Sequence, residues 1–285
     1  MERTIKPYQE LTIADDFMFA IVMSDPEISK PFLEAVLQKK IARIEVIDSQ
    51  KDLGDDYDNH GIRLDVYLED AAGTKYDIEM QTTRQKDLEK RIRYYQSGID
   101  RRMLRKSLDY DKLNDSYIIF VCLKDYYGAG LAMYERVSTI KDAPEAAYED
   151  GSHAIILNAS YKTANANPAV LEFLRYAKDT YEGKQFDSTK SQYLTKIEKV
   201  IKIAKQDEGK EKGYMTYALK MHETFKEGYT DGEADGLARG KSEMLFSIVA
   251  SMHAQGTPAE DIARMIGQPL DVVQDIIAKI EAKRA

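Results

Sequence analysis

The sequence predicts an α/β protein in which helices cover both sides of a sheet and a helical extension follows at the C-terminus. Three segments within residues 41–80 alternate apolar and polar side chains with period two, and segments of helical period precede and follow them. Residues 117–123 are apolar at every position except the tyrosine hydroxyl and the thiol, which is typical of a central strand buried on two faces. These observations together predict the layered α/β arrangement.

Composition narrows the class of protein. The 285 residues include 41 Lys and Arg against 49 Asp and Glu, a formal net charge of −8, and 43% are hydrophobic, which is enough for a large core. A single cysteine, Cys122, excludes an intrachain disulfide and a cysteine zinc site, so we expect a reducing, cytoplasmic setting. We expect neither a membrane span nor a nucleotide cofactor, because the sequence lacks an apolar run of about 18 residues and any phosphate-binding glycine motif.

The first half of the chain is expected to form two helices and a meander of strands. The first helix should cover Ile13–Met23. The second starts at Asp25-Pro26, a helix-capping residue followed by proline at the first helical position. Period-two alternation then predicts three strands, bounded by polar and glycine-containing breaks: Ile41–Asp48, Ile62–Leu68 and Tyr76–Met80.

The middle of the chain returns to helical period and then supplies further strands. A long helix is expected over Arg84–Leu108, because its apolar residues fall on one stripe. The central strand should be Tyr117–Leu123, and another strand should cover His153–Asn158. After Pro168 the pattern is helical to about residue 205, so residues 1–205 are expected to form one domain.

Glycine recurs every four residues in the next segment, at 228, 232, 236 and 240. Each glycine costs a helix about 1 kcal/mol relative to alanine, which favours a linker or a marginal helix over residues 206–240. Glycine at this spacing would also let two helices approach closely. Residues 241–285 are expected to form a small helical module of helix-turn-helix type, with helices at Met244–Met252, Thr257–Ile266 and Leu270–Ile280.

The net charge of this C-terminal module indicates which class of partner it binds. Residues 243–285 hold four basic and six acidic side chains, a net of −2 that disfavours phosphate binding. We therefore favour an oligomerisation or partner-binding module. The basic residues Lys279, Lys283 and Arg284 leave DNA binding open.

Two acidic residues on neighbouring strands are the candidate catalytic site. A hairpin centred on Ala72 places Asp65 directly opposite Glu79, with Cβ atoms about 4.5–5.5 Å apart. Carboxylates so placed repel each other unless a cation lies between them, and hard oxygen ligands suit Mg²⁺. Gln81 adds an amide on the same face, and His60 lies in the polar loop before Asp65. The alternative is that these acids line a solvated face of the sheet.

A basic helix follows the acidic pair directly. Residues 84–106 hold nine Lys and Arg against three acids, a net of +6 in a protein of net −8. Basic residues would hold the phosphates of a polyanion while a metal ion activates water and stabilises the charge that develops on the scissile phosphate. A solvated helix face with ion pairs such as Glu89–Arg93 would explain some of these charges, but not their excess.

Four segments in this order resemble a known family: Asp15-Asp16-Phe17-Met18-Phe19, Arg63-Leu64-Asp65-Val66, Ile78-Glu79-Met80-Gln81 and Arg91-Ile92-Arg93-Tyr94-Tyr95-Gln96. They look like the PD-(D/E)XK nuclease-family transposases of the recombination-promoting nuclease group, over residues from about 10 to 240. The resemblance implies a restriction-endonuclease-like core, a central mixed sheet flanked by helices, that cuts DNA with Mg²⁺, Mn²⁺ or Ca²⁺.

The resemblance also implies roles for individual residues. Asp65 and Glu79 would be metal ligands, and Asp16 matches an acidic position that can join them. Gln81 would position the attacking water. The helix after the acidic hairpin is expected to face DNA through Lys90, Arg91, Arg93, Tyr95 and Gln96.

One departure from the wider superfamily bears on activity. Gln81 stands where a lysine is usual, and an amide cannot supply the positive charge that would activate water. Another cation, such as Lys75 or Arg91, would then have to reach the site. We expect a slow endonuclease linked to recombination or transposition, with a catalytically degenerate DNA-binding or assembly protein as the alternative. Cutting both strands of a duplex symmetrically needs two active sites, so we expect a homodimer.

Overall fold

The computed structural model describes residues 5–52, 63–84, 86–104 and 108–282. In these residues six strands form one mixed sheet in the order β1-β2-β3-β4-β6-β5. The first three are antiparallel neighbours, β3, β4 and β6 run parallel, and β5 pairs with β6 as an antiparallel edge strand. The strands are β1 (Ile44–Asp52), β2 (Arg63–Asp70), β3 (Lys75–Gln81), β4 (Ser116–Cys122), β5 (Met133–Glu135) and β6 (Ser152–Asn158).

The β2–β3 hairpin has the register expected from the sequence. Its turn is closed by Asp70, whose Oδ1 accepts hydrogen bonds from the backbone N–H groups of Ala72 and Thr74, and Gly73 takes the positive φ of +85° that the turn requires. Val66 consequently pairs with Ile78. This register is the one that places Asp65 opposite Glu79.

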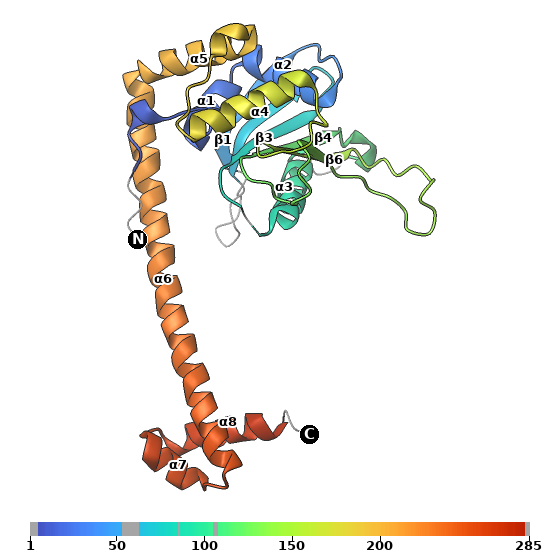
Figure 1. The fold of residues 1–285 in the computed structure, drawn as a ribbon. Helices are drawn as coiled ribbons and strands as arrows, with labels where there is room; N and C mark the ends of the chain where they lie inside the picture. The colour runs from blue at the N-terminus through green and yellow to red at the C-terminus, as the bar shows by residue number, and fades with distance from the viewer. Residues whose placement is uncertain (1–4, 53–62, 85, 105–107, 283–285) are drawn as a thin grey trace. The chain divides into compact units, whose positions relative to one another are not determined.

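Helices from both sides of the strand segment in the sequence cover one face of the sheet (Figure 1). They bury Val66, Leu68 and Ile78 of the hairpin, with Phe32 of α2 against Phe173 of α4 at a ring separation of 5.0 Å. The helices on this face are α1 (Asp16–Met23), α2 (Pro26–Leu37), α4 (Pro168–Tyr181) and α5 (Gln192–Lys205). The helical segment expected after Pro168 is thus two helices, which separate near Gly183, where φ is +70°.

The opposite face of the sheet is covered by α3 (Leu88–Met103). Its apolar stripe packs on alternate residues of the strands in one buried cluster: Tyr67, Leu88, Ile92, Tyr95, Ile99, Ile118, Phe120, Cys122, Ala154 and Ile156. Cys122 is therefore a core residue, as its apolar neighbours predicted. The alternative that the acids line a solvated sheet face does not hold for Glu79 and Asp77, which are buried under α3.

Element ends differ from the sequence-based prediction in a few places. The first helix begins at Asp16 and not at Ile13, and α3 begins at Leu88 and not at Arg84. The strand β5 was not expected, because three residues are too few to show a period.

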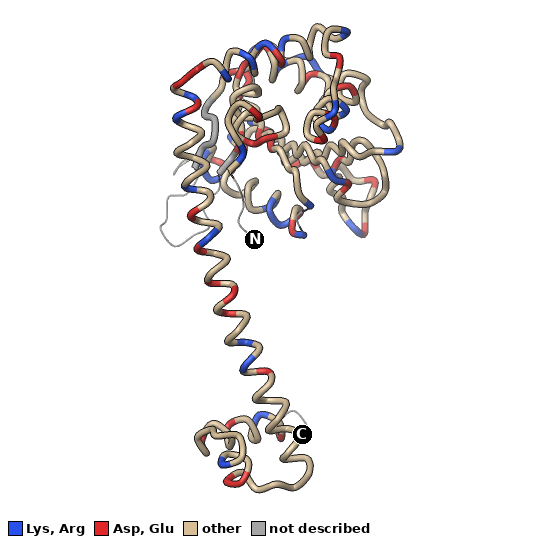
Figure 2. Tube along the Cα trace, turned by 60° about the vertical axis from the view of Figure 1, so that its left-hand side comes forward, with Lys and Arg blue, Asp and Glu red and all other residues tan. Residues whose placement is uncertain are grey.

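The chain divides into two compact units, residues 6–215 and a unit that contains residues 216–285. The helix α6 (Glu208–Ala254) is continuous across this division and across the four glycines, where a linker or marginal helix was expected. Figure 2 shows charges of both signs distributed along α6. In the second unit, the end of α6 packs with α7 (Ala259–Ile266) and α8 (Leu270–Ala282) around Val249, Ile262 and Val273.

The expected three-part division at residues 205 and 240 stays a prediction. The C-terminal module does form three packed helical segments, the first of which is the end of α6. Of its basic tail, Lys283 and Arg284 lie outside the described residues. Among the helices that the structure describes, none is both long enough and apolar enough to cross a membrane.

Candidate active site

The two acidic residues meet between β2 and β3, on the face that α3 covers. Glu79 Oε1 accepts a hydrogen bond from the backbone N–H of Asp65 at 3.0 Å. In return, Asp65 Oδ2 accepts one from the backbone N–H of Met80 at 3.1 Å. These reciprocal bonds hold both carboxylates at one point of the hairpin.

A single arginine from α3 reaches this pair. Arg91 Nη2 donates to Glu79 Oε2 at 2.6 Å, Nη1 donates to Gln81 Oε1 at 2.8 Å, and Nε donates to the Tyr95 hydroxyl at 2.8 Å. The guanidinium also lies 5.0 Å from the centre of the Tyr95 ring and 5.1 Å from that of Phe120, within the range of cation–π attraction. Hydrogen bonds and two aromatic rings therefore hold this side chain beside the acidic pair.

Burial sets the electrostatics of the acids. The Glu79 side chain is 1% exposed, and removal from water, followed by the nearby Asp65 charge, raises its pKa to about 8 in spite of Arg91. Asp77, which precedes it on the same face, is fully buried, and its pKa is raised by burial and by Glu79 and Asp65. Among the described residues, neither carboxyl oxygen of Asp77 has a hydrogen-bonding partner.

The amide of Gln81 is fixed at the end of β3. Its oxygen accepts from Arg91, and its Nε2 donates to Thr83 Oγ1 at 3.3 Å. Lys75, the other cation considered for this site, is instead paired with Glu69 at the opposite end of β3, at 2.5 Å. Arg91 is thus the cation that the fold brings to the acidic pair.

The third expected ligand, Asp16, lies at the start of α1. Asp16 is the first residue of α1, where its exposed carboxylate accepts from the N–H of Phe17. It also lies near Tyr214, whose pKa is raised by burial and by Asp15 and Asp16. Within the described residues, no three His, Cys, Asp or Glu side chains form a metal-binding group. Asp16 as a ligand stays a prediction, and His60 lies outside the described residues.

The residues expected to contact DNA divide into two sets. Lys90 and Arg93 are exposed on the outer side of α3. Arg91 and Tyr95 turn inward to the acidic pair. Gln96 is 7% exposed and donates to Asp100 at 2.9 Å and to Ser116. Its contact with DNA stays a prediction.

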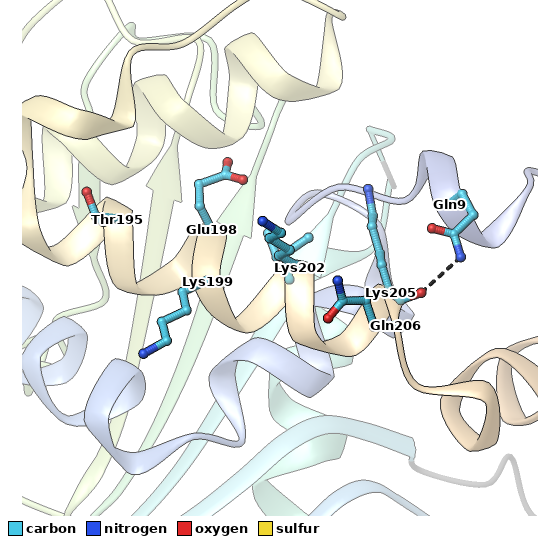
Figure 3. A pocket seen from close by; sticks show the side chains of 8 residues that line it. Gln9, Thr195, Glu198, Lys199, Lys202, Lys205 and Gln206 are labelled. Atoms are coloured by element: carbon cyan, nitrogen blue, oxygen red, sulfur yellow. Dashed lines mark hydrogen bonds between the residues drawn. The ribbon is translucent and has the colours of Figure 1, made fainter.

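A separate hollow of about 720 Å³ runs along α5. Three lysines line it, but Figure 3 shows their ammonium groups spread along the helix and not converging on one point. None of its lining residues belongs to the acidic pair or to α3: Gln9, Thr195, Glu198, Lys199, Ile201, Lys202, Lys205 and Gln206.

Comparison with family models connects this geometry to known proteins. The model described as PD-(D/E)XK nuclease family transposase matches residues 14–224, which include the hairpin and α3. The chain belongs to this family. Its mixed sheet with helices on both faces is the restriction-endonuclease-like α/β fold. Searches of curated proteins and of solved structures return no match.

The PD-(D/E)XK family implies a divalent metal, and the donor chemistry of this site fits one. Two carboxylates supply hard oxygen atoms, the burial of Glu79 disfavours its negative charge, and the buried oxygens of Asp77 have no hydrogen-bonding partner among the residues that the structure describes. A cation bound beside Asp65 and Glu79 would offset the accumulated negative charge.

Two contributors to the site were not assigned from the sequence. Strand alternation placed Asp77 on the same face as Glu79, but its burial depends on the docking of α3. Phe120 lies beside Glu79 through the parallel β3–β4 register. The apolar character of β4 on both faces was the available signal, since a strand buried on two sides requires a helix over the acidic face.

Proposed function

We propose that this PD-(D/E)XK family member is a divalent-metal-dependent DNA endonuclease that hydrolyses phosphodiester bonds in recombination or transposition. The observation that carries the proposal is the pair of reciprocal hydrogen bonds that holds two carboxylates together, one on the buried Glu79 and one on the half-buried Asp65. Arg91 offsets only part of the cost of this arrangement, since the pKa of Glu79 stays raised beside it, and carboxyl groups with strongly shifted pKa values are frequent at functional sites.

Each residue of the site would have a distinct task. Asp65 and Glu79 would hold Mg²⁺, or Mn²⁺ or Ca²⁺ in its place. The bound ion supplies activation of water and neutralises charge on the phosphate. Gln81, whose amide is fixed by Arg91 and Thr83, would orient the attacking water. A neutral amide does this without lowering the pKa of the water, so we expect slow turnover.

The outer side of α3 would bind the DNA backbone. Lys90, Arg93 and Arg101 are exposed there, within one helix that also positions Arg91. Basic side chains on one helix face bind phosphates without reading the sequence. A homodimer would supply the second active site that symmetric cleavage of both strands requires.

Cleavage of supercoiled plasmid tests the proposal. We expect purified protein to nick the plasmid with Mg²⁺ or Mn²⁺ and to lose this activity in chelator. Asp65→Asn and Glu79→Gln, which preserve side-chain size, should lower the nicking rate at least a hundredfold, because each removes a charged ligand.

Glu69→Gln is the matched control, since Glu69 is an acid of the same hairpin that pairs with Lys75 away from the site. It should nick like wild type. Equal activity in all four folded proteins would indicate a contaminating nuclease and contradict the assignment.

A non-enzymatic role is the second candidate, and two observations favour it. Gln81 lacks the charge of a catalytic lysine, and one oxygen of Glu79 is already paired with Arg91. A DNA-binding or assembly protein with this fold would bind duplex DNA in a gel-shift assay, and Arg93→Gln would lower its affinity for the DNA. It would show no metal-dependent nicking.

A further inference from the structure

The Glu79–Arg91 ion pair engages one of the two carboxylate oxygens of Glu79. Both Glu79 oxygens have protein donors: Oε1 takes the Asp65 N–H and Oε2 takes Arg91 Nη2. A divalent ion that coordinates Oε2 would have to displace the guanidinium or share the carboxylate with it. Two cations at one buried carboxylate repel each other strongly.

We propose that Arg91 is a positioning residue that controls the affinity of this site for divalent metal, holding Glu79 until the metal replaces it and keeping Gln81 aimed at the site. This inference rests on the proposed function. It assigns Arg91 to the site itself and not to the DNA surface where it was expected.

The contacts of Arg91 explain how it could release Glu79 and remain in place. Nη1 stays bonded to Gln81 and Nε to Tyr95, while the rings of Tyr95 and Phe120 flank the guanidinium. The contact between Nη2 and Glu79 Oε2 would be given up. The positive charge would then stay beside the hairpin, next to the uncharged Gln81.

The different exposure of Arg91 and Glu79 also explains why only a cation could replace Arg91 at Glu79. The Arg91 side chain is 25% exposed and Glu79 is 1% exposed, so water can solvate a displaced guanidinium but not a bare carboxylate. When Glu79 is ionised, it is therefore paired with Arg91 in the absence of metal and would be paired with the metal when one is bound.

Calorimetric titration of the full chain with Mn²⁺ tests this. Arg91→Gln removes the competing charge, so we expect its Mn²⁺ dissociation constant to fall at least tenfold while plasmid nicking also falls, because Gln81 loses its partner. Arg93→Gln is the matched control: it changes the net charge equally from an exposed position on the same helix, and its Mn²⁺ affinity should stay within about twofold of wild type.

Two further variants keep the test decisive. Tyr95→Phe removes only the hydroxyl that holds Arg91 Nε, and should tighten Mn²⁺ binding in the same direction by a smaller factor even if Arg91→Gln does not fold. Arg91→Lys retains the charge without the three-way contact, and should keep Mn²⁺ affinity near wild type while nicking falls.

The outcomes separate the two proposals. Unchanged or weaker Mn²⁺ binding in Arg91→Gln, or unchanged binding in Tyr95→Phe if Arg91→Gln does not fold, would overturn the role of Arg91 and leave the nuclease assignment intact. Absence of Mn²⁺ binding by wild type would overturn the metal-dependent function on which the role rests.

Discussion

Glu79 is the residue whose surroundings most constrain the chemistry. Its carboxyl group is buried against Asp65 and Asp77, and Arg91 is the cation paired with it. Negative charge at this position is favourable only with a cation beside it. The ionised Glu79 carboxylate therefore destabilises the metal-free fold and favours metal binding.

We predict a pH dependence of stability from this cost. In chelator, the folded-state pKa of Glu79, about 8, lies above its ordinary value of 4.5. The neutral form is thus favoured by folding, and this contribution is complete below pH 4.5 and lost as pH rises through 8. Thermal unfolding followed by circular dichroism should show wild type losing stability between pH 5 and 9.

Glu79→Gln is the control, because its amide does not titrate. Its melting temperature should fall less than that of wild type over the same pH interval. Parallel profiles for the two proteins would show that Glu79 does not ionise with a raised pKa.

At the scale of elements, α6 is the least supported helix. Over residues 223–243 every described side chain is exposed, and four of these residues are glycine. A Cβ placed on Gly228, Gly232, Gly236 or Gly240 would meet nothing within 4 Å. The described chain therefore gives no packing reason for glycine at these positions.

We predict that Gly232→Ala with Gly236→Ala stabilises α6, by about 1 kcal/mol per site from helix propensity. Helical circular dichroism on heating would measure the gain. Gly256→Ala is the contrasting control: space is equally open there, but φ is +81°, so alanine should destabilise. Loss of stability in the double variant would instead indicate that another helix packs against the glycine stripe.

For the whole molecule, the division between the two units can be located. Tyr214 lies in the first turns of α6, but its hydroxyl donates to the Lys6 carbonyl at 2.7 Å and its ring packs on Tyr8 and Phe17. These contacts belong to the unit of residues 6–215. The sequence placed the domain end at 205, before this contact.

We predict that a chain truncated after Met215 unfolds cooperatively and still nicks one strand of a supercoiled plasmid in the presence of metal. A chain truncated after Lys205 should melt at lower temperature, since Tyr8 and Phe17 lose the Tyr214 ring. Thermal unfolding of both proteins would measure this. Equal melting temperatures would place the boundary at 205, and failure of the longer chain to fold would contradict two independent units.

The sequence alone determined the layered α/β class and the hairpin that brings Asp65 to Glu79. These features follow from local rules, since alternation assigns each strand residue to a face and a short turn fixes the register. The family resemblance added the restriction-endonuclease-like fold, which the family match confirms.

Only the tertiary structure decided which side chains surround the acids. The docking angle of α3 on the sheet turns Arg91 to Glu79, buries Gln96 and leaves Arg93 in solvent. Helical period places these residues on a helix. It does not say which polar residues at the edge of the apolar stripe face the sheet, because that depends on packing between residues distant in sequence. The continuity of α6 through its glycines was likewise not readable from local propensity, which disfavours a helix there.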